Sequence, residues 1–266
     1  MELNLLVGIF IFMMGTIIGS FLNVCIVRLP LEKSIVFPSS HCVACRTPIE
    51  WYDNIPLISW ALLGGRCRAC REKISFRYWL VELLTGITFY LFYRHYGLQP
   101  VLLPYLVMVC GFIVATFVDF EHRIIPDEVS IGGMIAGVLF SLIIPQLHGT
   151  HSPFLGVGFS LLGVLVGGGT IYLMGVIGDA VFKKETMGGG DVKLMGMVGA
   201  FLGWKYALLT FFLAPFFGAG FGIVEKIRTK DSTIAYGPFL IIGALVSLFW
   251  GDNIINFLIS GGLYHL

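Results

Sequence analysis

The chain has 266 residues, of which 57% are hydrophobic and only 12% are charged, and its mean hydropathy is +0.88. Soluble domains carry about 25% charged residues, so this composition excludes an ordinary soluble protein and predicts a protein that crosses a membrane several times. The net charge of +1 says little about partners, and we expect no nucleic-acid partner. The placement of the charges along the chain is more informative than their sum.

The first apolar segment covers residues 5–24, and Glu2 is the only charged residue before it. A secretory signal begins with a basic segment, so we expect a retained membrane span here instead of a cleaved signal. A spanning helix needs about 20 predominantly apolar residues. The sequence therefore predicts an all-α polytopic membrane protein with about eight transmembrane helices, over residues 4–26, 79–96, 101–118, 129–146, 153–178, 193–203, 205–224 and 236–259.

Lys and Arg residues are distributed unevenly between the loops that join these helices. Fifteen of the 17 lie in or beside the first, third, fifth and seventh loops, and only Arg94 and Lys205 lie on the other side. Cytoplasmic loops of membrane proteins carry the excess of basic residues. The sequence therefore predicts that the odd-numbered loops face the cytoplasm and that both termini lie outside.

The first loop contains the one long polar segment, residues 28–78, with two Cys-x-x-Cys motifs separated by 21 residues. Four thiolates suit tetrahedral Zn²⁺, and a metal can supply the folding energy that an insert of about 50 residues lacks. A reducing cytoplasm disfavours disulfides, whereas redox-active or empty thiols remain an alternative. We predict a structural zinc site between the first two helices, with the ligands Cys42, Cys45, Cys67 and Cys70.

Two aspartates, Asp119 and Asp191, each lie at the edge of an apolar run. Asp119 follows the third predicted helix and Asp191 precedes the sixth, so the predicted topology places both at the cytoplasmic face. A charged group at membrane depth is costly and is retained mainly where it functions. Gly188, Gly189 and Gly190 directly precede Asp191, and their lack of Cβ atoms would let a substrate backbone lie close.

Paired carboxylates can carry out aspartic-protease chemistry. Repulsion between them would leave one proton shared, so that the ionised group takes a proton from water while the protonated group polarises a peptide carbonyl. Two other interpretations stay open on the residues alone. Each aspartate could cap or anchor its own helix, and a proton- or ion-coupled transporter would also need intramembrane carboxylates. Clustering at one face, without an obvious inverted repeat, argues against the transporter.

Motifs along nearly the whole chain resemble the type IV prepilin peptidases, also called leader peptidase/N-methyltransferases. Any one motif would be weak evidence, but the ordered set is specific. The Gly-Gly-Gly-Asp element also resembles that of other GxGD-type membrane aspartyl proteases. The remaining resemblance lies in the two Cys-x-x-Cys motifs, the Asp119 segment, and residues 19–30 (GSFLNVCIVRLP), 54–60 (NIPLISW), 74–82 (ISFRYWLVE) and 236–240 (YGPFL).

The resemblance implies a bifunctional enzyme of the bacterial inner membrane, with active sites that face the cytoplasm. It would cleave the basic leader from type IV prepilins or type II secretion pseudopilins, and then methylate the new N-terminal residue with S-adenosylmethionine. The family's catalytic aspartates fall on Asp119 and Asp191. The implied parts are a first transmembrane helix (1–27), a methyltransferase-associated zinc insert (28–78) and a seven-helix peptidase domain (79–266). Peptidase activity alone, with a structural insert, is a further alternative.

Three more residues have expected supporting roles. Glu82 could attract the ammonium group of the cleaved pilin or pair with nearby Arg77. Asp127 suits the start of the fourth helix, where the dipole favours acids, and could also attract the basic leader. Lys193 lies two residues after Asp191. One departure from the family pattern is the absence of the proline that commonly follows the first cysteine of the first motif, which should change the rigidity of that turn without removing a ligand.

Overall fold

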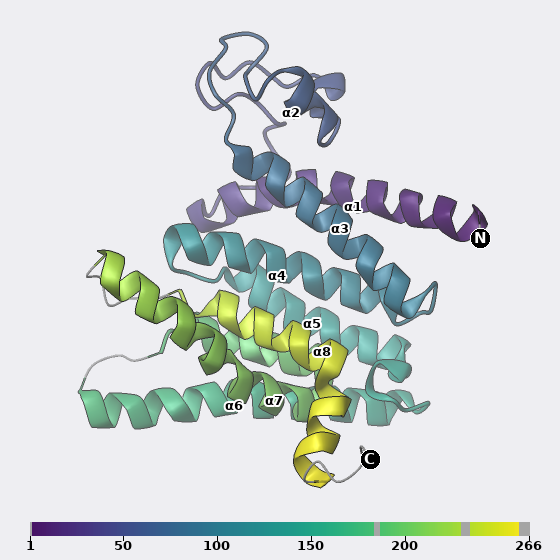
Figure 1. Ribbon diagram of the computed structural model, residues 1–266, viewed down its shortest axis with the longest axis vertical. Coiled ribbons are helices and arrows are strands. Elements are labelled where there is room, and N and C mark those ends of the chain that lie inside the picture. Colours follow the sequence, from purple (N-terminus) through teal and green to yellow (C-terminus); the bar gives the residue numbers. More distant parts are fainter. Residues whose placement is uncertain (1, 184–186, 230–234, 261–266) are drawn as a thin grey trace. The chain divides into compact units, whose positions relative to one another are not determined.

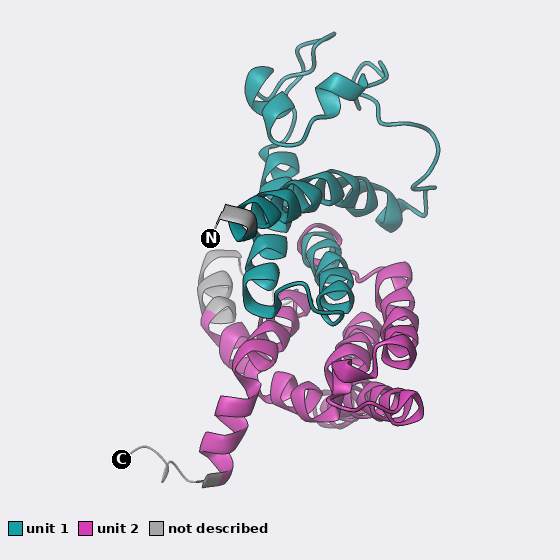
Figure 2. Ribbon diagram, turned by 90° about the vertical axis from the view of Figure 1, so that its right-hand side faces the viewer, with its two compact units in different colours: residues 1–118 teal, residues 119–266 magenta. Residues whose placement is uncertain are grey.

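A computed structural model describes residues 2–183, 187–229 and 235–260 of the chain. The described residues form helices and no β-strand, which confirms the predicted all-α class. They divide into two compact units, Met1–Val118 and Asp119–Leu266, which Figure 2 shows in different colours and which are described separately below. The three-part division into residues 1–27, 28–78 and 79–266 remains a prediction.

Unit 1 is built on two long helices, α1 (Glu2–Arg28) and α3 (Phe76–Tyr96), which pack side by side (Figure 1). Glycines allow this packing, because a Cβ atom on Gly15 would lie 2.8 Å from the Cα atom of Gly86. The insert between the two helices contains only short helices, η1 (Leu29–Leu31), η2 (Trp51–Asn54) and α2 (Ile58–Leu62). Helix α4 (Leu102–His122) starts in unit 1 and carries Asp119 in its last turn.

Unit 2 contains α5 (Asp127–Ile143), η3 (Pro145–His148), α6 (Pro153–Phe182), α7 (Gly189–Thr229) and α8 (Gly237–Ser260). Helices α6 and α7 pack through glycine against glycine, since a Cβ atom on Gly163 or on Gly199 would overlap the backbone of the other helix. Helices α5 and α8 also pack against α7. Close backbone approach of this kind is typical of helices that associate in membranes.

Helix α7 contains both the sixth and the seventh predicted spans, but its backbone breaks at Gly203, where φ is 78° and ψ is 172°. The break therefore lies at the predicted boundary between the two spans. Close to the break, the Ala200 carbonyl accepts a hydrogen bond from the Ser160 hydroxyl at 2.8 Å. The His148 ring lies against Gly203 and shares a 2.9 Å hydrogen bond with the Ser141 hydroxyl.

Among the described residues, five helices are long and apolar enough to cross a membrane, which supports a membrane protein. They correspond to the first, third, fifth and eighth predicted spans and to the sixth and seventh together. Helices α3 and α5 occupy the second and fourth predicted spans but do not belong to this set; α5 has only 17 residues, short for a bilayer of about 30 Å. The count of eight transmembrane helices is therefore not confirmed, and the five apolar helices are Asn4–Leu31, Leu102–His122, Pro153–Phe182, Gly189–Gly220 and Gly237–Ile259.

Candidate active site and metal cluster

Asp119 lies in the last turn of α4, and its side chain is buried, with an exposed fraction of 6%. Its Oδ2 atom accepts a hydrogen bond of 3.0 Å from the backbone N–H of Gly237, at the start of α8. A buried carboxylate requires such a donor, because burying a charged oxygen without a partner is costly. The first turn of α8 therefore fixes one oxygen of Asp119.

Asp191 lies in the first turn of α7 and is partly buried. It is close enough to Asp119 for the two carboxyl groups to interact electrostatically. Its Oδ2 atom lies 3.5 Å from the position that a Cβ atom on Gly188 would occupy, which is an ordinary contact distance, so Gly188 lies beside the carboxyl group. The structure thus brings the two predicted aspartates together within unit 2, although 71 residues separate them in the sequence.

The other two predicted glycines have different surroundings. A Cβ atom on Gly189 would meet no described atom within 4 Å, whereas one on Gly190 would lie 3.2 Å from the Cβ atom of Ile125. Ile125 belongs to the short loop between α4 and α5 and is buried. Gly190 therefore allows the start of α7 to pack closely against this loop, a role that differs from the predicted contact with substrate.

Asp127 and Lys193 form an ion pair of 2.6 Å between Lys193 Nζ and Asp127 Oδ1. Asp127 is the first residue of α5, as expected for an acid at a helix N-terminus, and Lys193 lies in the first turn of α7. Both side chains are exposed, and exposed ion pairs contribute about 0–1 kcal/mol to stability. The pair connects the two helices beside the aspartates, a partnership that the sequence analysis did not foresee.

The four predicted ligand cysteines lie together in the insert of unit 1, with all sulfur atoms within 4.8 Å of one another. The distance from Cys42 Sγ to Cys70 Sγ is 3.7 Å, and that from Cys45 Sγ to Cys67 Sγ is 4.0 Å. In a tetrahedral Zn²⁺ site with bonds of about 2.3 Å, the sulfur atoms would be roughly 3.8 Å apart. None of the four forms a disulfide. The cluster therefore fits a tetrahedral metal ion.

Each half of the cluster has the same local structure. In the first, the Cys42 N–H donates to the Thr47 carbonyl at 2.9 Å, and in the second the Cys67 N–H donates to the Glu72 carbonyl at 2.9 Å. Each turn contains a left-handed arginine, Arg46 or Arg71, after its second cysteine. In the first half, the Thr47 hydroxyl lowers the pKa of the Cys45 thiol to about 6, which favours the thiolate that a metal ion needs.

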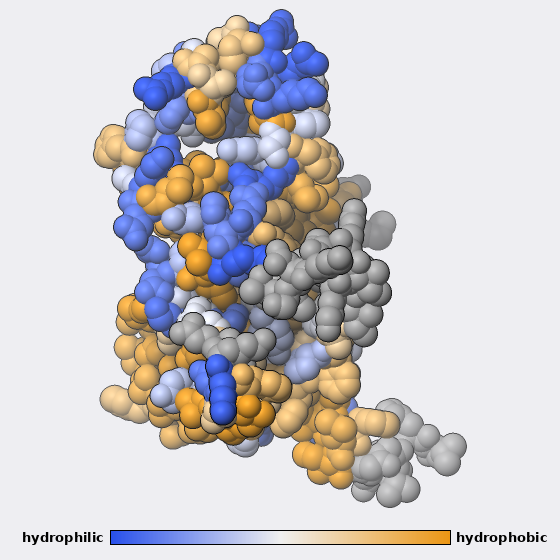
Figure 3. All heavy atoms as spheres, turned by 90° about the vertical axis from the view of Figure 1, so that its left-hand side faces the viewer, coloured by the Kyte–Doolittle hydropathy of each residue, from blue (hydrophilic) through white to orange (hydrophobic). Residues whose placement is uncertain are grey.

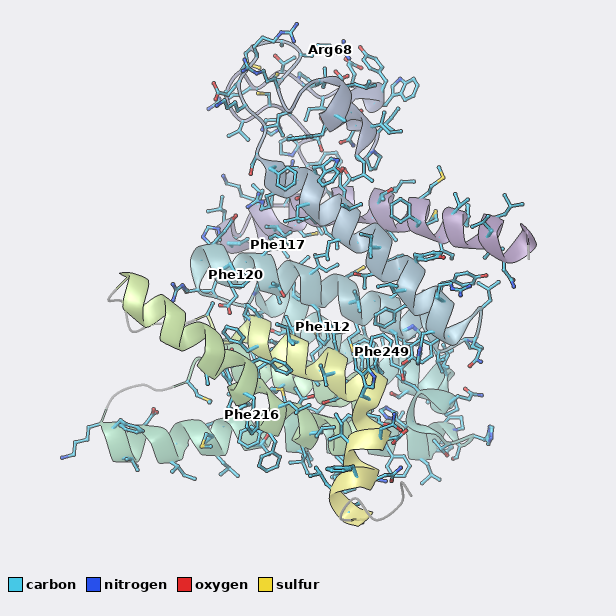
Figure 4. The ribbon with its side chains drawn as sticks, in the orientation of Figure 1. Arg68, Phe112, Phe117, Phe120, Phe216 and Phe249 are labelled. Carbon is cyan, nitrogen blue, oxygen red and sulfur yellow. The ribbon has the colours of Figure 1, made fainter. Side chains whose placement is uncertain are left out.

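The rest of the insert is held by polar and aromatic contacts. The Arg68 guanidinium, labelled in Figure 4, makes two hydrogen bonds of 2.7 and 2.6 Å to the Asp53 carboxylate. The ring of Trp60, in α2, meets the ring of Phe76, the first residue of α3, edge-on with centroids 5.6 Å apart. The insert exposes large side chains such as Trp51. Hydrophobic and hydrophilic residues lie side by side on the surface at the top of Figure 3.

Glu82 lies within α3, one turn beyond Tyr78, and is buried with an exposed fraction of 8%. Its Oε2 atom accepts a hydrogen bond of 2.7 Å from the backbone N–H of Leu57, in the insert. Leu57 has a positive φ of 63°, so this bond supports an uncommon backbone conformation. The partners expected for Glu82 were an ammonium group or Arg77, and this link between α3 and the insert was not among them.

Two residues of the aspartate region were missing from the predicted site. Gly237 lies within a motif, but no pattern in the chain indicates that its N–H reaches Asp119, which is 118 positions away. Ile125 looked like any apolar residue near a helix boundary. The local feature that could have indicated a buried residue here is the pair of isoleucines between Arg123 and Pro126, in a loop too short to form a core of its own.

Comparisons with known proteins identify the family of the chain. The model of the bacterial peptidase A24 N-terminal domain matches residues 13–96, and that of the type IV leader peptidase family matches residues 106–223. No solved structure matches the chain.

Three relatives carry names that describe prepilin processing. A prepilin leader peptidase/N-methyltransferase of Myxococcus xanthus is 40% identical over 84% of this chain, which spans only 64% of that relative. One of Aeromonas salmonicida is 32% identical over 94% of this chain and 93% of the relative. A type 4 prepilin-like proteins leader peptide-processing enzyme of Escherichia coli O78:H11 is 33% identical over 88% of the chain and 91% of the relative. The chain therefore belongs to the type IV leader peptidase family.

Proposed function

We propose that this protein is a membrane-bound aspartyl peptidase that removes the basic leader from type IV prepilins or type II secretion pseudopilins. The observation that carries the proposal is the meeting of Asp119 and Asp191 in unit 2, with Gly237 holding one oxygen of Asp119. The names of the relatives support prepilins as the substrates. Family membership favours this reading over the transporter that the carboxylates alone would also permit.

In the proposed reaction the two carboxyl groups share one proton. The ionised group takes a proton from a water molecule as that water attacks the scissile carbonyl, and the protonated group donates its proton to the carbonyl oxygen. The intermediate then collapses as the leaving amine receives a proton. The pair titrates as a unit, so the two roles belong to the pair of carboxyl groups.

We propose that this site lies at the cytoplasmic face of the bacterial inner membrane. A prepilin would present an apolar helix within the lipid and a basic leader in the cytoplasm, so its cleavage point would meet Asp119 at the end of α4 and Asp191 at the start of α7. The distribution of Lys and Arg supports this orientation, with about eight spans and both termini outside. The expected attraction of the basic leader to Asp127 has less support, because Lys193 compensates the charge of that carboxylate in a 2.6 Å ion pair.

We propose a second activity, N-methylation of the new terminal residue, with S-adenosylmethionine as the methyl donor. The relatives named leader peptidase/N-methyltransferases support it, and so does the presence of the whole insert, residues 28–78. The four cysteine sulfurs would hold a structural Zn²⁺, which would stabilise the fold of the insert. Holding donor and amine in line is the main requirement for methyl transfer.

The decisive experiment uses the purified protein in detergent with a prepilin and S-adenosylmethionine, and reads the products by mass spectrometry. Wild type should remove the leader and add a methyl group, whereas Asp119→Asn and Asp191→Asn should not cleave. Asp252→Asn, in an exposed position of α8, is the matched control and should cleave normally. Cleavage by either of the first two variants would reject the aspartyl pair, and a wild type that cleaves no suitable prepilin would reject the peptidase.

A further inference from the structure

Ile125 contacts the segments that hold both aspartates. A Cβ atom on Gly190, the residue before Asp191, would lie 3.2 Å from Ile125 Cβ, and one on Gly237 would lie 3.1 Å from Ile125 Cδ1. The side chain is 8% exposed, so it fills this position as a core residue would. Ile125 therefore contacts the start of α7 on one side and Gly237 on the other, and the N–H of Gly237 donates a hydrogen bond to Asp119.

Gly190 and Gly237 are needed because other atoms lie close to them, and not because their backbone conformation is unusual. Neither Gly190 nor Gly237 has a positive φ, so another residue could adopt either conformation. A Cβ atom on Gly237, however, would lie 2.8 Å from Asp119 Oδ2, a distance that Cβ atoms essentially never show. Any side chain at this position would push against the carboxylate that the Gly237 N–H holds.

The bond from Gly237 also distinguishes the two oxygens of Asp119. Oδ2 accepts the N–H at 3.0 Å, so one of its two lone-pair directions is occupied. A carbonyl oxygen accepts a hydrogen bond better than a hydroxyl oxygen, so this bond favours Oδ1 as the protonated oxygen of the carboxyl group. The oxygen that exchanges a proton with water or with Asp191 is then Oδ1.

We propose that Ile125, Gly190 and Gly237 form a spacer that sets the separation of the two carboxyl groups and leaves Oδ1 of Asp119 as its reactive oxygen. The inference rests on the proposed peptidase function and deepens it. All three are positioning residues, since each acts through Asp119 or Asp191. A misplacement of about 1 Å can lower a rate about 100-fold, so small changes in the spacer should reduce catalysis while substrate binding persists.

The test compares Gly237→Ala, Ile125→Ala and Ile125→Val with wild type in detergent, measuring kcat and KM for leader cleavage. We expect Gly237→Ala to lower kcat about 100-fold with little change in KM. Ile125→Ala should lower kcat less, and Ile125→Val, which removes only Cδ1, least. Combining Gly237→Ala with Ile125→Val should recover part of the loss. Gly132→Ala is the control, because its Cβ atom would meet no described atom within 4 Å.

Two further readouts separate positioning from loss of fold. Methyl transfer to a pilin peptide that already lacks its leader should remain normal in every variant. The interval between the acid and alkaline limbs of the kcat/KM profile should change in the spacer variants, because sharing of a proton depends on the distance between the groups. Unfolded enzyme would lower the amplitude and leave that interval unchanged.

If wild type is active and Gly237→Ala has the same kcat, the spacer proposal is rejected and the proposed peptidase function stands. Parallel loss of cleavage and methyl transfer, with an unchanged pH profile, would also overturn it and leave a purely structural role. Cleavage by Asp119→Asn would reject the proposed function itself, and the spacer with it.

Discussion

In the insert, residues 28–78, the four clustered cysteines are held by short turns and their hydrogen bonds. In unit 2, the two aspartates are held by long helices whose glycines let the helix backbones touch. The insert exposes large apolar side chains such as Phe37 and Trp51, whereas Asp119 and Ile125 of unit 2 are buried. A small polar module needs a ligand to be rigid, and a helical bundle obtains rigidity from packing.

The largest expected effect is confined to unit 2. Asp119→Asn and Asp191→Asn should each lower leader cleavage by about 10³-fold or more, because general acid–base catalysis contributes about 10²–10⁴-fold and the pair acts as a unit. Methyl transfer to a peptide without its leader should persist in both variants. Assaying both activities on one preparation checks this, and loss of both together would mean that the two regions are not independent.

Metal removal should have the converse effect. A chelator strong enough to remove Zn²⁺ should unfold the insert, since metal binding supplies about 10–16 kcal/mol to small zinc modules, and methyl transfer should be lost. Leader cleavage should fall less than tenfold, because the aspartates lie in unit 2. Metal analysis before and after chelation, together with both assays, measures this. Equal loss of both activities would contradict the assignment of methyl transfer to the insert and of leader cleavage to unit 2.

A smaller effect is expected from the glycine packing. Gly163→Ala places a methyl group into the backbone of α7 and should destabilise the protein by about 1–3 kcal/mol, the range typical of overpacking. Gly158→Ala, in the same helix, is the control because its Cβ atom would meet no described atom within 4 Å. Thermal unfolding in detergent compares the two, and equal midpoints would show that α6 and α7 can separate without cost.

The smallest effect concerns Asp53. Its hydrogen bonds from Arg68 hold the pKa of the carboxyl group below its ordinary value, so the ionised pair stabilises the folded insert above that ordinary pKa. This stabilisation is lost as the pH falls through the lowered pKa. Asp53→Asn should therefore lower the unfolding midpoint of the insert slightly at neutral pH and converge with wild type in acid. Fluorescence of Trp51, two residues away, follows the transition, and a constant difference at all pH values would refute the assignment.

Much of this arrangement could be predicted from the sequence, but only where the signal is local. Apolar runs predict the long helices, and the predicted boundary between the spans 193–203 and 205–224 lies beside the break of α7 at Gly203. The cysteine spacing predicted the cluster that the structure shows. The pairing of Asp119 with Asp191 was expected from topology and from the family resemblance. Two hydrogen bonds could not be predicted: the one from the Gly237 N–H to Asp119 and the one from the Leu57 N–H to Glu82. Both depend on tertiary packing, which leaves no pattern in the chain.

The matching turns around Cys42 and Cys67 have a consequence for how the insert can be lost or kept. Each turn is a half-site that supplies two sulfur atoms, and neither half can enclose a tetrahedral ion alone. If the cluster holds the proposed Zn²⁺, oxidation of one cysteine would remove one of the four ligands and weaken the hold of both turns on the ion. The fold of the insert would then be sensitive to oxidants, whereas the helices that carry Asp119 and Asp191 supply no ligand of this cluster.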